Sequence, residues 1–282
     1  MSFIVCNGKF SNADLPVIPA SSRGLRYGDG LFETLKFKND RLVLIDEHLS
    51  RLWQGMKLLQ FDIPRLFTPD KLEEEMLSLI KKNKLTNARI RITVIRGNGG
   101  LYDTEAQQLN YLIETWPLPD NNGKLNENGL HLCLYRNAVK MADSFSNCKH
   151  NNFLPYVMGA LHARQEKCND AILLNQFGNI CDSTIANVFL IKDGNIITPS
   201  LSQGCIAGVM RKFVIDSLKN EGISVLETEI TPDELINADE VFLTNSIYNL
   251  RWVGRIDDRV YGNSKTMEIY HLLSRTNPVD FC

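Results

Sequence analysis

A lysine stands just ahead of an apolar helical pattern in the segment "SNCKHNNFLPYVMGALHARQE", which begins at Ser146. From Asn151 on, the segment is expected to be helical, because apolar residues recur at spacings of three and four. Lys149 lies immediately before this face, between a cysteine and a histidine. An ordinary surface lysine would be solvated, whereas an amine held out of water could form a Schiff base. The apolar face consists of Leu154, Val157, Met158, Leu161 and His162.

Three further features could bind an anion. Gly208 precedes a helix expected to begin near Val209, and the free N–H groups of a helix start bind phosphate well. The segment "TNSIYN" follows the apolar strand "EVFL" and offers hydroxyl and amide groups at a strand end. Arg51 lies on an expected helix and is either a surface charge or a phosphate clamp. A helix cap, a turn and a solvated arginine are the ordinary explanations of the same features.

Other patterns argue against whole classes of site. The segment "RGNGG" lacks the Lys-Ser/Thr of a P-loop, so we expect a mobile loop rather than a nucleotide site. The two glycines of "YGDGLFET" fit either a turn or a loop that lines a site. The five histidines show no metal-ligand spacing, and the seven cysteines include no CxxC pair. We therefore expect no metal site and no disulfide framework.

Charge and composition limit the possible partners. The 282 residues carry a formal net charge of -2, and no basic run suggests nucleic acid as a partner. The start of the chain lacks the layout of a signal peptide, and no apolar run has the length of a membrane span. We expect a reduced, cytoplasmic, soluble protein that acts on a small molecule.

The hydrophobic pattern predicts mixed α and β structure in two domains. Strand hairpins are expected at Asn7-Gly8 and Asn39-Asp40, and Asp46 is expected to cap the helix that carries Arg51. Residues 117–124, "PLPDNNGK", form the best linker in the chain. The boundary is placed there, which gives a smaller N-terminal α/β domain, residues 1–118, and a larger C-terminal domain, residues 119–282.

Taken in order, these pieces resemble the class IV aminotransferases, the fold-type IV enzymes that use pyridoxal 5′-phosphate. This family includes branched-chain aminotransferases, D-amino acid aminotransferases and 4-amino-4-deoxychorismate lyases. The resemblance implies a two-domain fold like that of D-amino acid aminotransferase, in which the larger domain, residues 119–282, binds the cofactor. It also implies a homodimer in which the loop after the "RG" strand reaches the neighbour's site. The resemblance is carried by the blocks "RGLRYGDGLFET", "EHLSRL", "RGNGG", "CKHNNFL", "GNICDSTIANVFLIKDG", "GCIAGVMRKFVI" and "ADEVFLTNS".

The resemblance also implies roles for individual residues. Lys149 matches the lysine that forms the Schiff base with the cofactor, and Asn152 matches an asparagine shortly after it. The cofactor phosphate would be held by a set of residues that match the family's arginine, helix start and hydroxyl. This set is Arg51, Val209, Met210 and Ser246.

Asp182 stands where the family usually carries a glutamate that faces the pyridine nitrogen of the cofactor. A carboxylate at this place favours the protonated ring by charge attraction. The aspartate reaches roughly 1.5 Å less far than glutamate, about one bond length. Either the backbone moves closer, a water bridges the gap, or the ring nitrogen is less strongly protonated.

The motifs favour one branch of the family. Leu101 and Asp103 occupy the positions where D-amino acid aminotransferases carry an arginine and a histidine, and neither residue can pair with a carboxylate. "TNSIYN" replaces the "GTAAE" of branched-chain enzymes, whereas "KH.N", "RG.GG" and "G.MR" resemble the lyases. We expect a 4-amino-4-deoxychorismate lyase that releases pyruvate and 4-aminobenzoate, a folate precursor. A branched-chain or related aminotransferase is the alternative, and a catalytically retired scaffold is a further one. The expected substrate-contacting residues are Phe32, Tyr102, Asn245 and Ile247.

Overall fold

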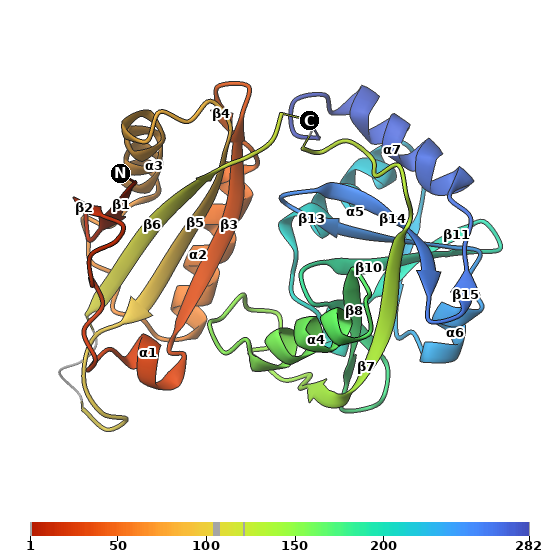
Figure 1. Cartoon of the computed structure of the whole chain (residues 1–282), viewed down its shortest axis with the longest axis horizontal. Helices are drawn as coiled ribbons and strands as arrows, with labels where there is room; N and C mark the ends of the chain where they lie inside the picture. Colours follow the sequence, from red (N-terminus) through yellow and green to blue (C-terminus); the bar gives the residue numbers. More distant parts are fainter. Residues whose placement is uncertain (1, 104–107, 121, 282) are drawn as a thin grey trace. The chain divides into compact units, whose positions relative to one another are not determined.

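The computed structural model describes residues 2–103, 108–120 and 122–281. The chain separates into two compact units (Figure 1), one formed by Met1–Asn122 with Lys149–Phe153 and the other by Gly123–Cys148 with Leu154–Cys282. The sequence did not indicate that the short Lys149–Phe153 segment belongs with the first unit. Position 121 of the expected linker and the terminal Cys282 lie outside the described residues.

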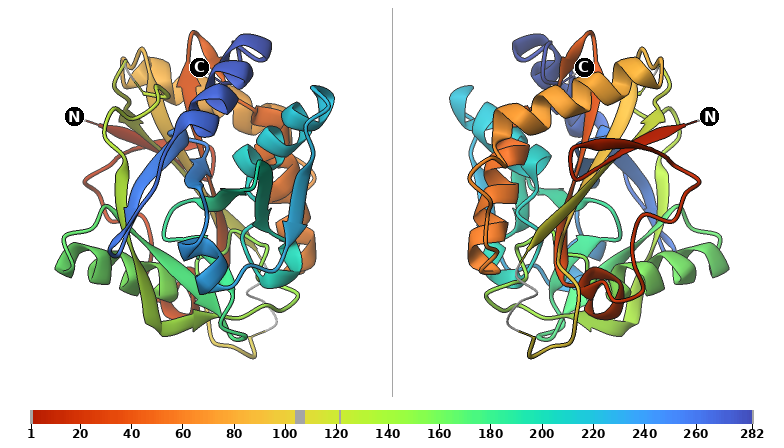
Figure 2. Two further views of the ribbon diagram at one scale, coloured as in Figure 1. Left: turned by 90° about the vertical axis from the view of Figure 1, so that its right-hand side faces the viewer. Right: turned by 90° about the vertical axis from the view of Figure 1, so that its left-hand side faces the viewer.

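The first unit contains an antiparallel sheet with the strand order β2-β1-β6-β5-β3-β4. Helices α2 and α3 cover one face of this sheet (Figure 2). Alternate residues of β5, such as Ile90, Ile92 and Val94, are fully buried, which is the pattern of a strand with one core face. The elements are β1 (Phe3–Cys6), β2 (Lys9–Asn12), α1 (Arg23–Tyr27), β3 (Gly30–Lys38), β4 (Arg41–Leu42), α2 (Ile45–Leu58), α3 (Pro69–Lys82), β5 (Ala88–Arg96) and β6 (Leu109–Pro117).

Both predicted hairpins of this unit are confirmed. Asn7 and Gly8 join β1 to β2, Asn39 and Asp40 join β3 to β4, and all four residues have positive φ. Two consecutive left-handed residues give the tight turn whose twist matches that of paired strands. The prediction that Asp46 caps α2 is wrong, because the helix begins at Ile45, before Asp46, and no side chain caps it. Asp46 lies in the first turn, where its charge still suits the helix dipole.

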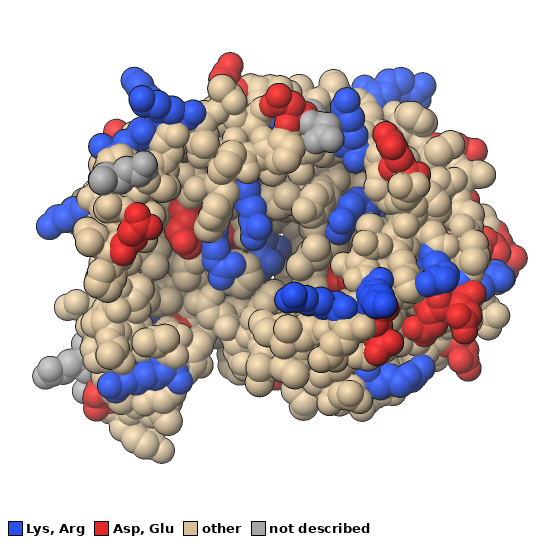
Figure 3. Space-filling model, viewed as in Figure 1, with Lys and Arg blue, Asp and Glu red and all other residues tan. Residues whose placement is uncertain are grey.

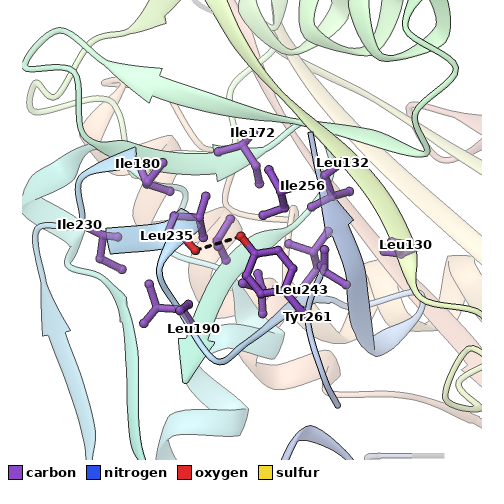
Figure 4. Close-up of a cluster of buried hydrophobic side chains, with 14 of the residues drawn as sticks. Leu130, Leu132, Ile172, Ile180, Leu190, Ile230, Leu235, Leu243, Ile256 and Tyr261 are labelled. Carbon is purple, nitrogen blue, oxygen red and sulfur yellow. Dashed lines mark hydrogen bonds between the residues drawn. The ribbon is translucent and has the colours of Figure 1, made fainter. Parts of the chain in front are cut away.

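The second unit is built around a mixed sheet with the order β12-β11-β10-β13-β14-β7-β8-β9, and β15 pairs with β14. Helix α4 packs on β7 and β8, and α5 and α7 pack on β13. One face of the sheet buries the aliphatic cluster of Figure 4, in which Tyr261 donates its hydroxyl proton to the Leu235 carbonyl. The elements are β7 (Leu130–Lys140), α4 (Leu154–Gln165), β8 (Asp170–Asn175), β9 (Ile180–Ser183), β10 (Asn187–Lys192), β11 (Asn195–Pro199), η2 (Leu201–Gln203), α5 (Val209–Asn220), β12 (Val225–Thr228), α6 (Pro232–Ile236), β13 (Glu240–Asn245), β14 (Asn249–Ile256), β15 (Arg259–Val260) and α7 (Ser264–Thr276).

The orientation of α4 differs from the simple amphipathic interpretation. The helix begins at Leu154 rather than Asn151, and it buries Tyr156, Gly159 and Ala163. A Cβ at Gly159 would lie 2.8 Å from Leu173 and 3.0 Å from Thr184, so only glycine lets the helix approach β8 this closely. The other side of the helix is apolar and open to solvent. Its residues Leu154, Val157, Met158 and Leu161 are between 40% and 65% exposed.

The described part of the chain shows neither a membrane-spanning helix nor a cluster of metal ligands. Among the residues that the structure describes, no helix has the length and apolar character needed to cross a membrane. The same residues contain no cluster of three or more histidine, cysteine, aspartate or glutamate side chains arranged to hold a metal ion. Charged side chains of both signs are scattered over the face shown in Figure 3.

Candidate functional site

Lys149 lies at the edge of the first unit, beside the beginning of β3. The Phe32 N–H donates to the Lys149 carbonyl at 2.9 Å, and the Asn151 N–H donates to the Gly30 carbonyl at 2.8 Å. A Cβ at Gly30 would collide with the Val94 carbonyl and with the Asn151 side chain, so the two segments approach closely only because residue 30 is glycine. The backbone of Lys149 is therefore fixed by β3.

Two aromatic rings surround the amine of Lys149. Its Nζ lies 4.4 Å from the centroid of Phe32 and 5.7 Å from that of Phe153. The two rings meet edge to face with their centroids 5.2 Å apart. Phe32 was expected to line a substrate pocket, and it lies against the predicted reactive amine.

Arg51 is held by a buried carboxylate. Its Nε donates to Oε1 of Glu33 at 2.7 Å, and its Nη2 donates to Oε2 at 2.6 Å. His48 Nδ1 lies 2.7 Å from the same Oε2, and both Glu33 and His48 are almost completely buried. Because the guanidinium is gripped by two parallel hydrogen bonds, its plane is fixed before any ligand arrives.

The protonation of this group follows from its surroundings. Burial would raise the pKa of Glu33, but the Arg51 charge and the hydrogen bonds from His48 and Arg51 outweigh it and lower that pKa to about 2. Burial is also the largest influence on His48 and lowers its pKa, assisted by the charges of Arg51 and Lys149 and opposed by Glu33. At neutral pH the group thus holds an ionised glutamate, a charged arginine and a neutral histidine.

Arg91 was not among the predicted site residues, and it contacts Phe32 beside Lys149. The Arg91 Cζ lies 3.8 Å from the centroid of the Phe32 ring, the ring that Lys149 also contacts. Its Nε donates to the Thr93 hydroxyl at 3.1 Å. The alternation of "ARIRITVIR" places Arg91 on the face of β5 opposite the core, which was the available signal.

Asp182, on β9 of the second unit, is almost completely buried and satisfied by several donors. Its Oδ2 accepts from Lys140 Nζ at 3.1 Å, from the Tyr156 hydroxyl at 2.9 Å and from the Ile206 N–H at 3.0 Å. Its Oδ1 accepts from Asn187 Nδ2 at 2.9 Å. The Cys181 thiol also donates weakly to Oδ2, at 3.9 Å, so the carboxylate is fixed in place by donors from several segments of the unit.

Asn187 connects this carboxylate to the helix start that was predicted to bind phosphate. Its Nδ2 also donates to the Ile206 carbonyl at 2.8 Å, and a Cβ at Gly208 would collide with its Oδ1. Helix α5 begins at Val209, as predicted, and no side chain caps it. The first N–H groups of α5, at Val209 and Met210, are thus not covered by a side-chain cap.

Strand β13 brings hydroxyl groups to the same region. Thr244 pairs with Asn187 across the sheet, and its buried Oγ1 has no hydrogen-bond partner in the described part of the chain. Ser246 follows two residues later and is half-buried. The second unit therefore gathers Asp182, the start of α5 and the end of β13.

Of the other predicted residues, Asn245 holds a turn, and Tyr102 and Leu101 are exposed. The Asn245 side chain accepts from the N–H groups of Ile247 and Tyr248 and donates to the Ile185 carbonyl, so it holds the turn after β13. Tyr102 is 93% exposed, and Leu101 beside it is 62% exposed.

The loop "YGDG" has a structural function that the sequence left open. Asp29 pairs with Arg23 at 2.9 Å and with Arg96 at 3.0 Å. Arg23 also donates to the Gly100 carbonyl. This loop therefore ties α1 to the "RGNGG" segment through charged hydrogen bonds.

We predict that the Glu33 group makes the stability of the protein acid-sensitive. The folded-state pKa of about 2 lies below the ordinary 4.5, so the ionised carboxylate stabilises the fold above pH 4.5, and this is lost as the pH falls toward 2. His48 acts in the same direction below pH 6.5, because its pKa is also lowered. Glu33→Gln should cost about 3–5 kcal/mol at neutral pH, since it leaves buried partners uncompensated.

Urea unfolding measured between pH 2.5 and 7 tests this prediction, with the exposed Glu74→Gln as the matched control. The acid dependence should flatten in Glu33→Gln and persist in the control. An unchanged acid dependence in Glu33→Gln would contradict the assignment.

Comparison with known proteins identifies relatives along nearly the whole chain. A provisionally named branched-chain-amino-acid aminotransferase of Methanocaldococcus jannaschii is 31% identical over 268 residues, which cover 94% of this chain and 92% of the relative. An aminodeoxychorismate lyase of Vibrio harveyi is 30% identical over 241 residues, covering 85% of this chain and 87% of that protein.

Solved structures show the same fold. The branched-chain aminotransferase of the thermophilic archaeon Thermoproteus uzoniensis, solved with norvaline, superposes with a TM-score of 0.86 at 23% identity and covers 97% of this chain and 94% of that one. A further branched-chain amino acid aminotransferase with this fold was solved with pyridoxamine 5′-phosphate. The predicted mixed α and β fold of the fold-type IV enzymes is thereby confirmed. The family model described as amino-transferase class IV matches residues 30–256, so the chain belongs to the class IV aminotransferases, enzymes that use pyridoxal 5′-phosphate as cofactor.

Proposed function

We propose that this enzyme is a lyase that releases pyruvate from 4-amino-4-deoxychorismate and leaves 4-aminobenzoate. The main support is the group formed by Lys149, Phe32 and Arg91. The amine of Lys149 and the guanidinium of Arg91 both lie over the Phe32 ring. The substrate is a cyclohexadiene ring with an amine at one end and a carboxylate at the other, and it becomes a flat aromatic ring in the product. An aromatic wall flanked by a base and a cation complements these three features.

The residues present fit pyridoxal 5′-phosphate. In the second unit, the orphaned Thr244 hydroxyl and the uncapped start of α5 offer donors for an anion. The glycine at 208 keeps that start free of a side chain. We assign the phosphate to Arg51, Val209, Met210 and Ser246, and the pyridine nitrogen to Asp182.

When bound, the cofactor supplies an electron sink for a carbanion. Lys149 would carry it and, once the substrate amine has taken its place, the freed Nζ would be the base that takes the proton from the substrate carbon bearing the amine. The Phe32 and Phe153 rings shield this amine from water on their side. Once the proton is removed, the neighbouring C–O bond would break, enolpyruvate would leave with that bond's electron pair and gain a proton to become pyruvate, and the substrate ring would become aromatic. Lys149 would then take back the cofactor and free 4-aminobenzoate.

The second candidate is an aminotransferase for branched-chain or related amino acids. It is favoured by the archaeal relative, which matches 94% of this chain. Arg91 also suits this reaction, because it could take the second carboxylate of a dicarboxylic amino acceptor. The two candidates differ in whether an amino group is passed to an acceptor.

We predict that Lys149→Ala abolishes turnover and the yellow colour of the bound cofactor. The expected loss is at least about 10⁴-fold, because the same amine carries the cofactor and moves the proton. Borohydride reduction followed by peptide mapping should place the cofactor on Lys149. A label on Lys140 or Lys167 would refute the assignment. Lys140→Ala is a poor control because Lys140 pairs with Asp182, so the exposed Lys167→Ala is preferable.

The lyase proposal is tested by a paired assay on one enzyme preparation. With 4-amino-4-deoxychorismate, we expect stoichiometric pyruvate and 4-aminobenzoate without any amino acceptor. With a branched-chain amino acid and 2-oxoglutarate, we expect little glutamate. Rapid glutamate formation without pyruvate would establish the second candidate and leave the family membership untouched.

We further propose that the enzyme is a homodimer, as the family resemblance implies. The solvent-exposed apolar side of α4 supports this, because a contiguous apolar surface favours association. Tyr102 and Leu101 would then line the partner's pocket, and their high exposure leaves them able to contact a neighbour.

Sedimentation should give twice the chain mass of 32.0 kDa. Met158→Asp, on the exposed side of α4, should weaken the dimer at least about tenfold, because a charge would be buried in an apolar contact. Val260→Asp, at an exposed apolar site on β15, is the matched control. A fully active wild-type monomer would contradict this proposal.

A further inference from the structure

The buried Lys140 contacts Asp182 and has no function in the reaction as described above. It ends β7, its side chain is 7% exposed, and its Nζ lies 3.1 Å from Asp182 Oδ2. Its ammonium also lies 5.2 Å from the ring centroid of Tyr156, which donates to the same oxygen. A buried lysine is uncommon, and a buried ion pair brings little net stability, so this pair calls for another explanation.

The two oxygens of Asp182 are used unequally. Oδ2 accepts hydrogen bonds from Lys140, Tyr156 and Ile206 and a weaker one from the Cys181 thiol, whereas Oδ1 accepts one, from Asn187. Oδ2 is crowded by these donors, so Oδ1 is the oxygen with room for a further one. A cationic ring N–H would therefore meet Oδ1.

The other titratable groups near Asp182 are neutral or directed elsewhere. The pKa values of Tyr156 and Cys181 are raised by burial and by Asp182, and burial raises the pKa of Cys205 to about 12, so these groups are neutral. Arg211 directs its guanidinium to Glu227 at 2.6 Å and to the Pro199 carbonyl at 2.9 Å. Among the described residues, Lys140 is the cation that contacts Asp182.

We propose that Lys140 is a positioning residue that sets how strongly Asp182 holds the proton on the cofactor's pyridine nitrogen. By occupying Oδ2, it turns Oδ1 toward the ring, and its charge offsets the carboxylate and weakens the attraction for a second cation. The electron sink is thereby weaker than one facing an uncompensated carboxylate. This proposal rests on the assignment of Asp182 to the pyridine nitrogen.

The test measures the nitrogen itself rather than turnover. Holoenzyme is reconstituted with ¹⁵N-labelled pyridoxal 5′-phosphate, and the nitrogen resonance is followed by NMR across pH. In Lys140→Gln, which keeps a donor but loses the charge, the ratio of protonated to neutral nitrogen should rise at least about tenfold at the wild-type midpoint. Lys140→Arg should retain the wild-type ratio. Lys192→Met, on an exposed lysine paired with Asp239, is the surface control.

Two results would overturn the proposal in different ways. An unchanged ratio in Lys140→Gln, with a clear change in Asp182→Asn, would leave the cofactor assignment standing and make Lys140 purely structural. No change in Asp182→Asn would show that another acid faces the nitrogen, so the assignment and the proposal fail together. If Lys140→Gln does not fold, Lys140→Arg and Asp182→Asn still test the proposal. A change in the nitrogen's protonation ratio as large in Lys140→Arg as in Asp182→Asn would contradict a role for the charge, because arginine keeps it.

Discussion

A carboxylate buried away from water must be matched by donors and positive charge, and each unit of this enzyme satisfies that constraint once near its predicted site. In the first unit, Glu33 is matched by Arg51 and His48. In the second, Asp182 is matched by Lys140, Tyr156, Asn187 and a backbone N–H. Because these partners come from separate strands and helices, the two carboxylates fix the relative positions of the segments that carry the proposed cofactor residues within each unit.

Local chemistry was the part of the fold that could be predicted. The two hairpins were predicted because their paired left-handed residues depend on a few neighbouring residues, whereas the predicted Asp46 cap was wrong. The short buried strand β9 was missed, because a run such as "ICDS" has no alternation to show. The apolar side of α4 was recognised, but periodicity alone does not tell which side of a helix faces the core when Gly159 and Ala163 provide the close contact.

The sequence allowed candidate site residues to be proposed but did not show how their side chains interact. Asp182 was proposed from the family resemblance and Gly208 from the helix that follows it, but their coupling through Asn187 depends on strand pairing that the sequence does not show. Lys140 and Arg91 looked like ordinary charged residues until the structure placed one beside a buried acid and the other on an aromatic ring. Side chains brought together by long-range pairing leave no local pattern.

The assignment of the Lys149–Phe153 segment to the first unit has a consequence for biosynthesis. During translation, β3 is complete long before Lys149 leaves the ribosome, so Phe32 initially lacks both its hydrogen bond to Lys149 and its ring contact with Phe153. The first unit can be finished only after part of the second unit has been made. Nascent chains should therefore pass through a stage in which this edge of β3 is open and needs protection from association with other chains.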